Sequence, residues 1–238
     1  MNDGFQQLAP AGSSQEYSAP WSVRECWLGV VLLVFIDLSL FVIVSQISKV
    51  RLIQNVGVVF AELAYLLPVM LIFAWRGIPW KHLGFGKFSW STMGLGCGLL
   101  IAGYLLIILH NTILYLFGVD TQGSEIVNIF EEIGSPIWLF LVGVVCAPLV
   151  QEIFFRGFLF QGFRQRYGWA NAMLLSSGIF AAAHLDPVAL IPTFILGNVL
   201  AYVYHRSNSV WPGMILHFLV NALSLSAAYL MTRFQLPL

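Results

Sequence analysis

Long apolar runs dominate this chain and limit the folds open to it. Hydrophobic residues make up 59% of the 238 residues and charged residues only 9%. Several uninterrupted runs approach the ~20 apolar residues that a membrane-spanning helix needs. The sequence therefore predicts an all-α fold, a polytopic bundle of transmembrane helices. About seven spans are expected from a hydropathy window of about nineteen residues, at 27–47, 56–75, 92–117, 137–163, 169–185, 188–204 and 211–230.

Charge and cysteine content argue against several other classes of protein. The formal net charge is zero and no basic run occurs, so nothing supports nucleic-acid binding. Cys26, Cys97 and Cys146 are scattered and odd in number, which indicates neither a disulfide framework nor a cysteine-based metal site. The polar start of the chain has no basic n-region, so we expect no cleavable signal peptide.

The expected organisation has three parts. Residues 1–25 are predicted to form a disordered cytoplasmic tail, residues 26–135 the N-terminal transmembrane helices, and residues 136–231 a set of core helices that carry the polar motifs. Lysine and arginine are more numerous in the loops on one side of the predicted spans. The positive-inside rule then places the N-terminus in the cytoplasm and the C-terminus outside.

Three polar clusters interrupt the apolar segments of the C-terminal part, at Gln151–Arg156, Phe180–His184 and His217–Asn221. A charged side chain at the centre of a bilayer costs roughly 2.5–3.5 kcal/mol on insertion scales, so ionisable groups in spans usually face a protein or water-filled interior. Glu152 and Arg156 are spaced i,i+4 in the order that favours an ion pair. We expect the chemistry of the protein at these clusters.

Helix geometry indicates that the clusters can meet. The midpoint between Gln151 and His184 falls at Tyr167-Gly168, where a turn is expected, so in two antiparallel helices the two residues lie at the same depth. His217 and Asn221 are four residues apart and share one helix face. Two imidazoles, two amides and a carboxylate with its guanidinium can therefore converge in one buried cavity.

The clusters resemble the signatures of the CPBP family of intramembrane proteases, the Abi-type enzymes that process CAAX proteins and bacteriocins. Gln151–Arg156 resembles the first signature, Glu-Glu-x-x-x-Arg. Phe180–His184 matches the second, Phe-x-x-x-His, and His217–Asn221 matches the third, His-x-x-x-Asn. All three occur in order on separate predicted spans. The N-terminal half resembles the family only in being hydrophobic.

The resemblance implies hydrolysis of a peptide bond in a membrane-associated or lipidated substrate. Water would be activated at the first-motif position and His184, while His217 and Asn221 would stabilise the oxyanion. No cofactor is expected; zinc, as in a metalloendopeptidase, is the alternative. The expected partners are a membrane protein, peptide or lipidated-protein substrate and the lipid bilayer. The implied catalytic residues are Gln151, Glu152, His184, His217 and Asn221, supported by Arg156 and Phe180.

Gln151 departs from the family, which has its first glutamate at this position. An amide can hydrogen-bond water, but it cannot take a proton as a general base near neutral pH. Three explanations are open: an engineered inactivation, a natural non-catalytic member, or an enzyme in which Glu152 or His184 takes over.

Other readings of the same residues compete with a protease. Glu152 and Arg156 could be a structural ion pair, and His184 could simply bind a backbone carbonyl at a helix end. A catalytically silent membrane scaffold is the strongest rival. A proton-coupled transporter using Asp37 and Glu62 ranks lower, because the sequence has no inverted repeat; those two acids are expected to pair with internal polar groups.

Overall fold

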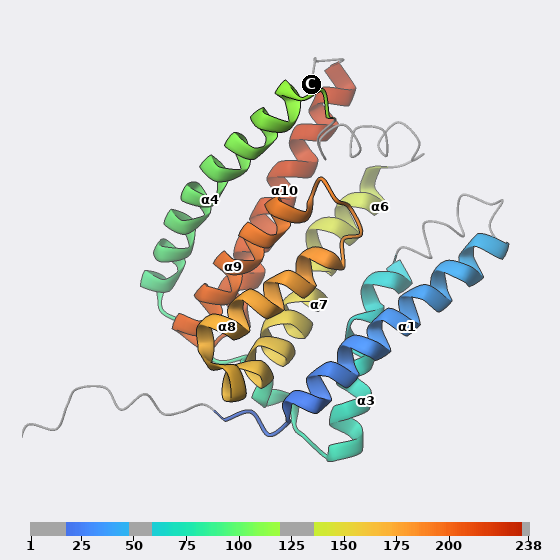
Figure 1. The fold of residues 1–238 in the computed structure, drawn as a ribbon, viewed down its shortest axis with the longest axis vertical. Coiled ribbons are helices and arrows are strands. Elements are labelled where there is room, and N and C mark those ends of the chain that lie inside the picture. Colours follow the sequence, from blue (N-terminus) through green and yellow to red (C-terminus); the bar gives the residue numbers. More distant parts are fainter. Residues whose placement is uncertain (1–17, 48–58, 120–135, 235–238) are drawn as a thin grey trace, which may run out of the picture.

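The computed structural model describes residues 18–47, 59–119 and 136–234, and its regular elements in these ranges are all helical (Figure 1). A helical segment over 59–64 leads directly into α3. The named elements are α1 (Val23–Ile47), α3 (Leu66–Arg76), the 3-10 helix η1 (Trp80–Leu83), α4 (Trp90–Leu116), α6 (Pro136–Phe140), the π-helix η2 (Leu141–Cys146), α7 (Ala147–Glu152), the π-helix η3 (Ile153–Phe160), α8 (Gln161–Ala182), α9 (Leu190–Ser207) and α10 (Val210–Phe234).

Multiple apolar helices mark this chain as an integral, multi-pass membrane protein. Two of the seven predicted spans, 137–163 and 169–185, overlap one long apolar segment, Ile137–Ala182, and α9 is not among the helices apolar enough to cross a membrane. Its last turn carries His205 and Arg206, which lower its apolar character. The seven-span count is thus matched only in part. Five segments of the described residues are long and apolar enough to cross a membrane: Val23–Ile43, Val59–Arg76, Trp90–Leu116, Ile137–Ala182 and Val210–Phe234.

The chain reverses direction inside α8. Gly168 has φ 74° and ψ 165°, a conformation that is essentially restricted to glycine because it has no Cβ. The helix that ends there and the helix that begins after it are therefore two arms of a hairpin, visible in Figure 1 where the ribbon turns back between α7 and α8. The turn predicted at this glycine is confirmed.

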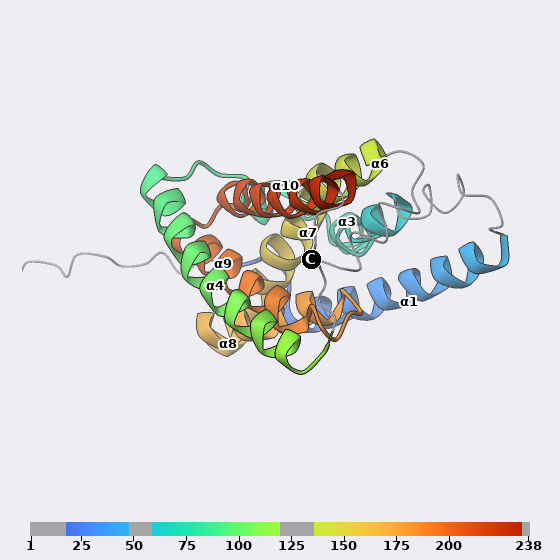
Figure 2. The same cartoon turned by 90° about the horizontal axis from the view of Figure 1, so that it is seen from above.

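The helix that carries the start of the first motif, α7, lies in the middle of the bundle (Figure 2). Seen from above in Figure 2, α7 is near the centre, with α4 and α1 at opposite sides. The core is rich in phenylalanine, and Phe154, Phe155 and Phe158 are fully buried. Outward-facing apolar side chains on the flanking helices, such as Phe35 and Leu105, stay 68% and 64% exposed. Such surface suits contact with lipid tails.

Residues 18–25 are ordered, contrary to the tail predicted over 1–25; residues 1–17 lie outside the described ranges. The Trp21 side chain is 2% exposed, and its Nε1 donates a hydrogen bond to the Phe158 carbonyl at 3.0 Å. Glu25, in the first turn of α1, forms an ion pair with Arg76 at the end of α3. A large aromatic residue and a buried acid thus fix the start of α1 to the bundle.

Candidate active site

The first motif lies on a helix that changes its winding before the motif and again within it. Pro148 has no N–H and its ring crowds the carbonyl four residues earlier, so a regular α-helix cannot run through this position. The preceding turn is π-helical, and the Ala147 N–H bonds to the Val142 carbonyl, five residues back. A second π-helix, η3, begins at Ile153. Such wide turns are frequent at functional sites.

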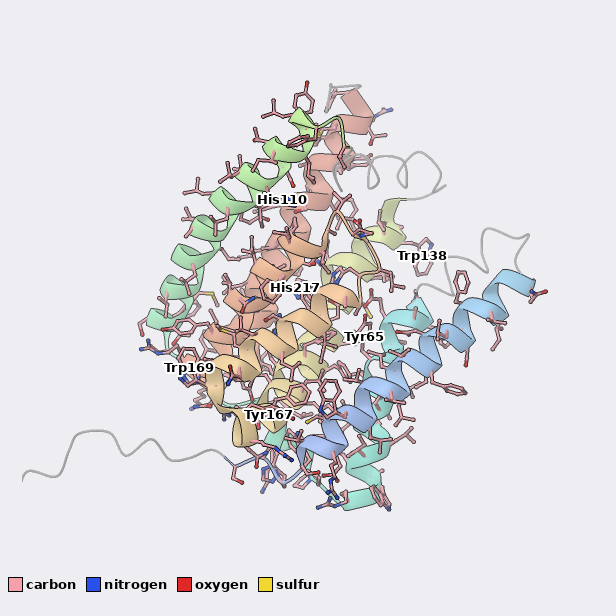
Figure 3. The ribbon with its side chains drawn as sticks, viewed as in Figure 1. Tyr65, His110, Trp138, Tyr167, Trp169 and His217 are labelled. Atoms are coloured by element: carbon pink, nitrogen blue, oxygen red, sulfur yellow. The ribbon has the colours of Figure 1, made fainter. Side chains whose placement is uncertain are left out.

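A cavity of about 450 Å³ lies among these helices. Its lining comes from the 59–64 segment, α4, η2, α7, the turn after α8, α9 and α10. Figure 3 labels His217, which lies near the middle of the bundle. The polar side chains that line the cavity include Glu62, Asn111, Gln151, His184, His217 and Asn221. One residue or more of each predicted motif therefore faces the same space.

Both motif histidines use Nδ1 for an internal hydrogen bond. His184 Nδ1 lies 2.8 Å from the Phe180 carbonyl, and because a carbonyl only accepts, Nδ1 must be the donor. His217 Nδ1 lies 3.1 Å from Glu152 Oε1. In each neutral ring the other nitrogen, Nε2, then carries a lone pair. His184 does make the carbonyl contact of the structural reading, but it also lines the cavity.

Glu152 lies behind the cavity rather than in its lining. Its side chain is 0% exposed, and Oε1 accepts hydrogen bonds from Arg156 Nη1 at 2.7 Å and from His217 Nδ1. Gly213 lets α10 approach this carboxylate, because a Cβ there would lie 2.7 Å from Glu152 Oε2. Glu152 is thus placed to orient the His217 ring.

Arg156 and Phe180 brace this arrangement. The Arg156 guanidinium also donates from Nη2 to the Gly197 carbonyl at 3.1 Å, and its Cζ lies 4.5 Å from the centre of the Phe180 ring. The Phe180 ring meets both imidazoles edge to face, with centroid distances of 4.8 Å to His184 and 5.8 Å to His217. One aromatic ring therefore separates and supports the two histidines.

Asn221 is held by the helix opposite. Its Nδ2 donates to the Gly143 carbonyl in η2 at 2.7 Å, which ties α10 to the motif helix. A primary amide has two N–H donors. One is engaged by Gly143, so a second remains for a ligand in the cavity.

Glu62 is the cavity residue whose role sequence reasoning missed. Gln151 Nε2 donates to Glu62 Oε2 at 3.0 Å, so the internal polar partner expected for this acid is Gln151 itself. The other unexpected acid, Asp37, has an Oδ1 atom that is buried without a partner within the described residues. The available signal was an acidic side chain inside an apolar run, but nothing local connects residue 62 with residue 151.

The donor set of the cavity bears on the zinc alternative. Zinc sites in enzymes use three protein ligands drawn from His, Asp, Glu and Cys, with a fourth position open. Within residues 18–47, 59–119 and 136–234, no three such side chains are grouped closely enough to hold a metal ion.

Comparison with known proteins agrees with the motifs. Residues 133–223 match the family model described as type II CAAX prenyl endopeptidase Rce1-like. The chain is 26% identical over 173 residues to the Bacillus subtilis (strain 168) protein named "Putative membrane peptidase YdiL", which covers 71% of this chain and 69% of that protein. No solved structure matches the chain at a comparable level.

Two further bacterial relatives are similar over shorter regions. UPF0177 protein YxdF of Lactococcus lactis is 28% identical over 145 residues, which is 60% of this chain and 78% of that protein. An uncharacterized 24.3 kDa protein of Escherichia coli is 30% identical over 100 residues, 40% of this chain and 46% of that protein. The region matched by the family model, residues 133–223, contains all three polar clusters, and this part of the chain matches the Rce1-like CAAX prenyl endopeptidase (CPBP) family of membrane peptidases.

Proposed function

We propose that this chain is an intramembrane endopeptidase that hydrolyses a peptide bond of a membrane-associated or lipidated substrate without a metal cofactor. The observation that carries the proposal is the cavity itself, because Gln151, His184, His217 and Asn221 come from three separate segments and line one space. Their hydrogen bonds leave an acceptor on each imidazole and a donor on the Asn221 amide facing a possible ligand.

The roles follow from these atoms. A water held between Gln151 and His184 Nε2 would attack the scissile carbonyl. The second N–H of Asn221 would stabilise the oxygen as it becomes negative, which is where preorganised donors have their largest effect. His217 would add a second donor there once its Nε2 carries a proton. Glu152 would fix the His217 ring through Nδ1, at 3.1 Å.

Loss of either imidazole tests the proposal. In vesicles holding the purified protein and a prenylated peptide or an unlipidated peptide of the same sequence, we expect His184→Ala and His217→Ala to lower turnover by about 10²–10⁴, the range for losing an acid, base or oxyanion group. Preference for the prenylated peptide would support a lipidated substrate. Undiminished turnover in either variant, with unchanged thermal stability in detergent, would refute the site.

A catalytically silent scaffold is the second candidate, and Gln151 favours it because an amide replaces the family's carboxylate. The two candidates differ in one measurement. A scaffold binds the membrane substrate but leaves it intact, both in the chain as it stands and after His184→Ala. Cleavage that is lost in His184→Ala would exclude the scaffold.

We also propose seven spans with the N-terminus in the cytoplasm and the C-terminus outside. Basic residues collect at one end of the described bundle: Arg76 pairs with Glu25, Arg164 Nη1 bonds to Asn208 at 2.9 Å, and Gln161 joins the same end to the His82 carbonyl at 3.0 Å. The positive-inside rule assigns such an end to the cytoplasm. Reporter fusions in the loops after η1 and after α9 should both report cytoplasm.

A further inference from the structure

The carboxylate that is missing from the first motif has a neighbour that can replace it. Glu62 Oε2 lies 3.0 Å from Gln151 Nε2, and both side chains line the cavity that also holds His184 and His217. Glu62 comes from a helix far from the motifs in sequence, outside the region 133–223 that matches the family model. The site thus contains a carboxylate next to the position where the family's first glutamate would be.

Packing fixes the helix that carries Glu62. Tyr65, one turn further on, contacts two buried phenylalanines within the first motif: its ring lies 5.8 Å from that of Phe154 and 5.6 Å from that of Phe155. Residues about one turn apart on a helix lie on neighbouring parts of its surface. The face that presents Glu62 is therefore held against the motif helix.

The other carboxylates near the motifs are poorly placed to accept a proton from water. Glu152 is fully buried, lies outside the cavity lining, and already accepts from Arg156 and His217. Asp37 is not among the residues that line the cavity. Of the described residues in that lining, Glu62 is the one with a carboxylic acid.

We propose that Glu62 is the general base of this peptidase, with Gln151 as the residue that positions it. The inference rests on the proposed endopeptidase function. The Gln151 N–H holds Oε2, which leaves Oε1 for the attacking water. An amide donor next to a carboxylate orients that carboxylate without competing for the proton, because the amide itself does not titrate.

The reaction balances with water as the only co-reactant. Glu62 takes one proton from water while the water oxygen bonds to the scissile carbonyl carbon, and the carbonyl electron pair moves to its oxygen. Collapse of this intermediate breaks the carbon–nitrogen bond. The proton on Glu62 passes to the departing nitrogen, so the products are a carboxylic acid and an amine, and Glu62 is again ionised.

Exchange of the two side chains gives the sharpest test. The variants are Glu62→Gln, Gln151→Glu and the double exchange Glu62→Gln/Gln151→Glu, with Asp37→Asn as the matched control for loss of an acid within a span. In vesicles with the prenylated peptide, Glu62→Gln should lower kcat by about 10²–10⁴. The double exchange returns a carboxylate to the same hydrogen-bonded pair and should recover most of that loss. Asp37→Asn should cleave like the parent.

The positioning role of Gln151 has its own readout. Gln151→Met removes the N–H that holds Glu62 while keeping a side chain of similar length. It should lower kcat at least tenfold and leave KM nearly unchanged, because the lost contact orients the base and not the substrate. A change confined to KM would assign Gln151 to substrate binding and overturn its positioning role.

The outcomes separate this inference from the proposed function. If Glu62→Gln keeps the parent kcat while His184→Ala abolishes cleavage, the Glu62 assignment is wrong and the peptidase stands. If the parent does not cleave the peptide and the single variant Gln151→Glu does, the general base belongs at position 151, and the Glu62 assignment is again wrong. If the parent, Gln151→Glu and the double exchange all fail to cleave while remaining folded, both proposals fall.

Discussion

The variant Arg156→Met tests how much the buried ion pair between Arg156 and Glu152 contributes to stability. Arg156 is 1% exposed and donates to Glu152 Oε1 at 2.7 Å and to the Gly197 carbonyl at 3.1 Å. Methionine keeps much of the apolar stem but leaves the Glu152 charge buried. Removing one partner of a buried pair typically costs about 3–5 kcal/mol. At roughly 2–4 °C per kcal/mol for a chain of this size, the melting temperature should fall by about 6–20 °C.

The double variant Glu152→Gln/Arg156→Met separates charge from packing. It removes both charges and keeps an oxygen that can accept from His217 Nδ1, so we expect it to regain most of the lost stability. Thermal unfolding in detergent is the assay. Arg166→Met is the matched control, since Arg166 is exposed and exposed charges contribute about 0–1 kcal/mol. An Arg156→Met variant that melts at the same temperature as the parent, or a double variant less stable than the single one, would contradict this expectation.

Two further predictions concern the turn and the metal. Gly168→Ala should destabilise the protein by about 1–3 kcal/mol, because φ 74° with ψ 165° is strained for any residue with a Cβ. The control is Gly178→Ala, where a Cβ meets open space in a regular helix. Equal melting temperatures of the two variants would contradict the expected strain. Elemental analysis of the active protein should find far less than one zinc per chain, and chelators should leave the activity unchanged. About one zinc per chain, with activity lost on chelation and restored by zinc, would overturn the metal-free mechanism but not the proposed peptidase function.

Those parts of the fold that depend on local signals could be predicted from the sequence. The hairpin turn is predicted by Arg164, Arg166 and Gly168 between two apolar runs, and Gly168 has the backbone conformation that such a turn needs. The convergence of the three motifs follows from helical periodicity and equal rise per residue. Both features depend only on local sequence and distances along the chain.

Contacts between distant helices could not be predicted in the same way. Trp21 is buried because its indole reaches the Phe158 carbonyl, and Glu62 joins the cavity because Tyr65 packs on Phe154 and Phe155. These contacts depend on which helix faces which. A hydropathy window detects an apolar run and does not record its neighbours. From such patterns the polar start of the chain is therefore predicted to be a tail, and no particular partner is predicted for Glu62.

The surroundings of the two glutamates suit them to different work. Glu152 is fully buried, and its Oε1 accepts from both a guanidinium and an imidazole. A proton on this carboxylate would remove the negative charge that strengthens both hydrogen bonds. Glu62 has a neutral amide partner and borders the cavity, so it can gain and release a proton without breaking an ion pair. Burial and the charge of the hydrogen-bond partners thus suit Glu152 to fixing the geometry of the site and Glu62 to accepting a proton. On this argument the glutamine of the first motif moves the reactive group to a neighbouring helix and leaves the chemistry of the cavity intact.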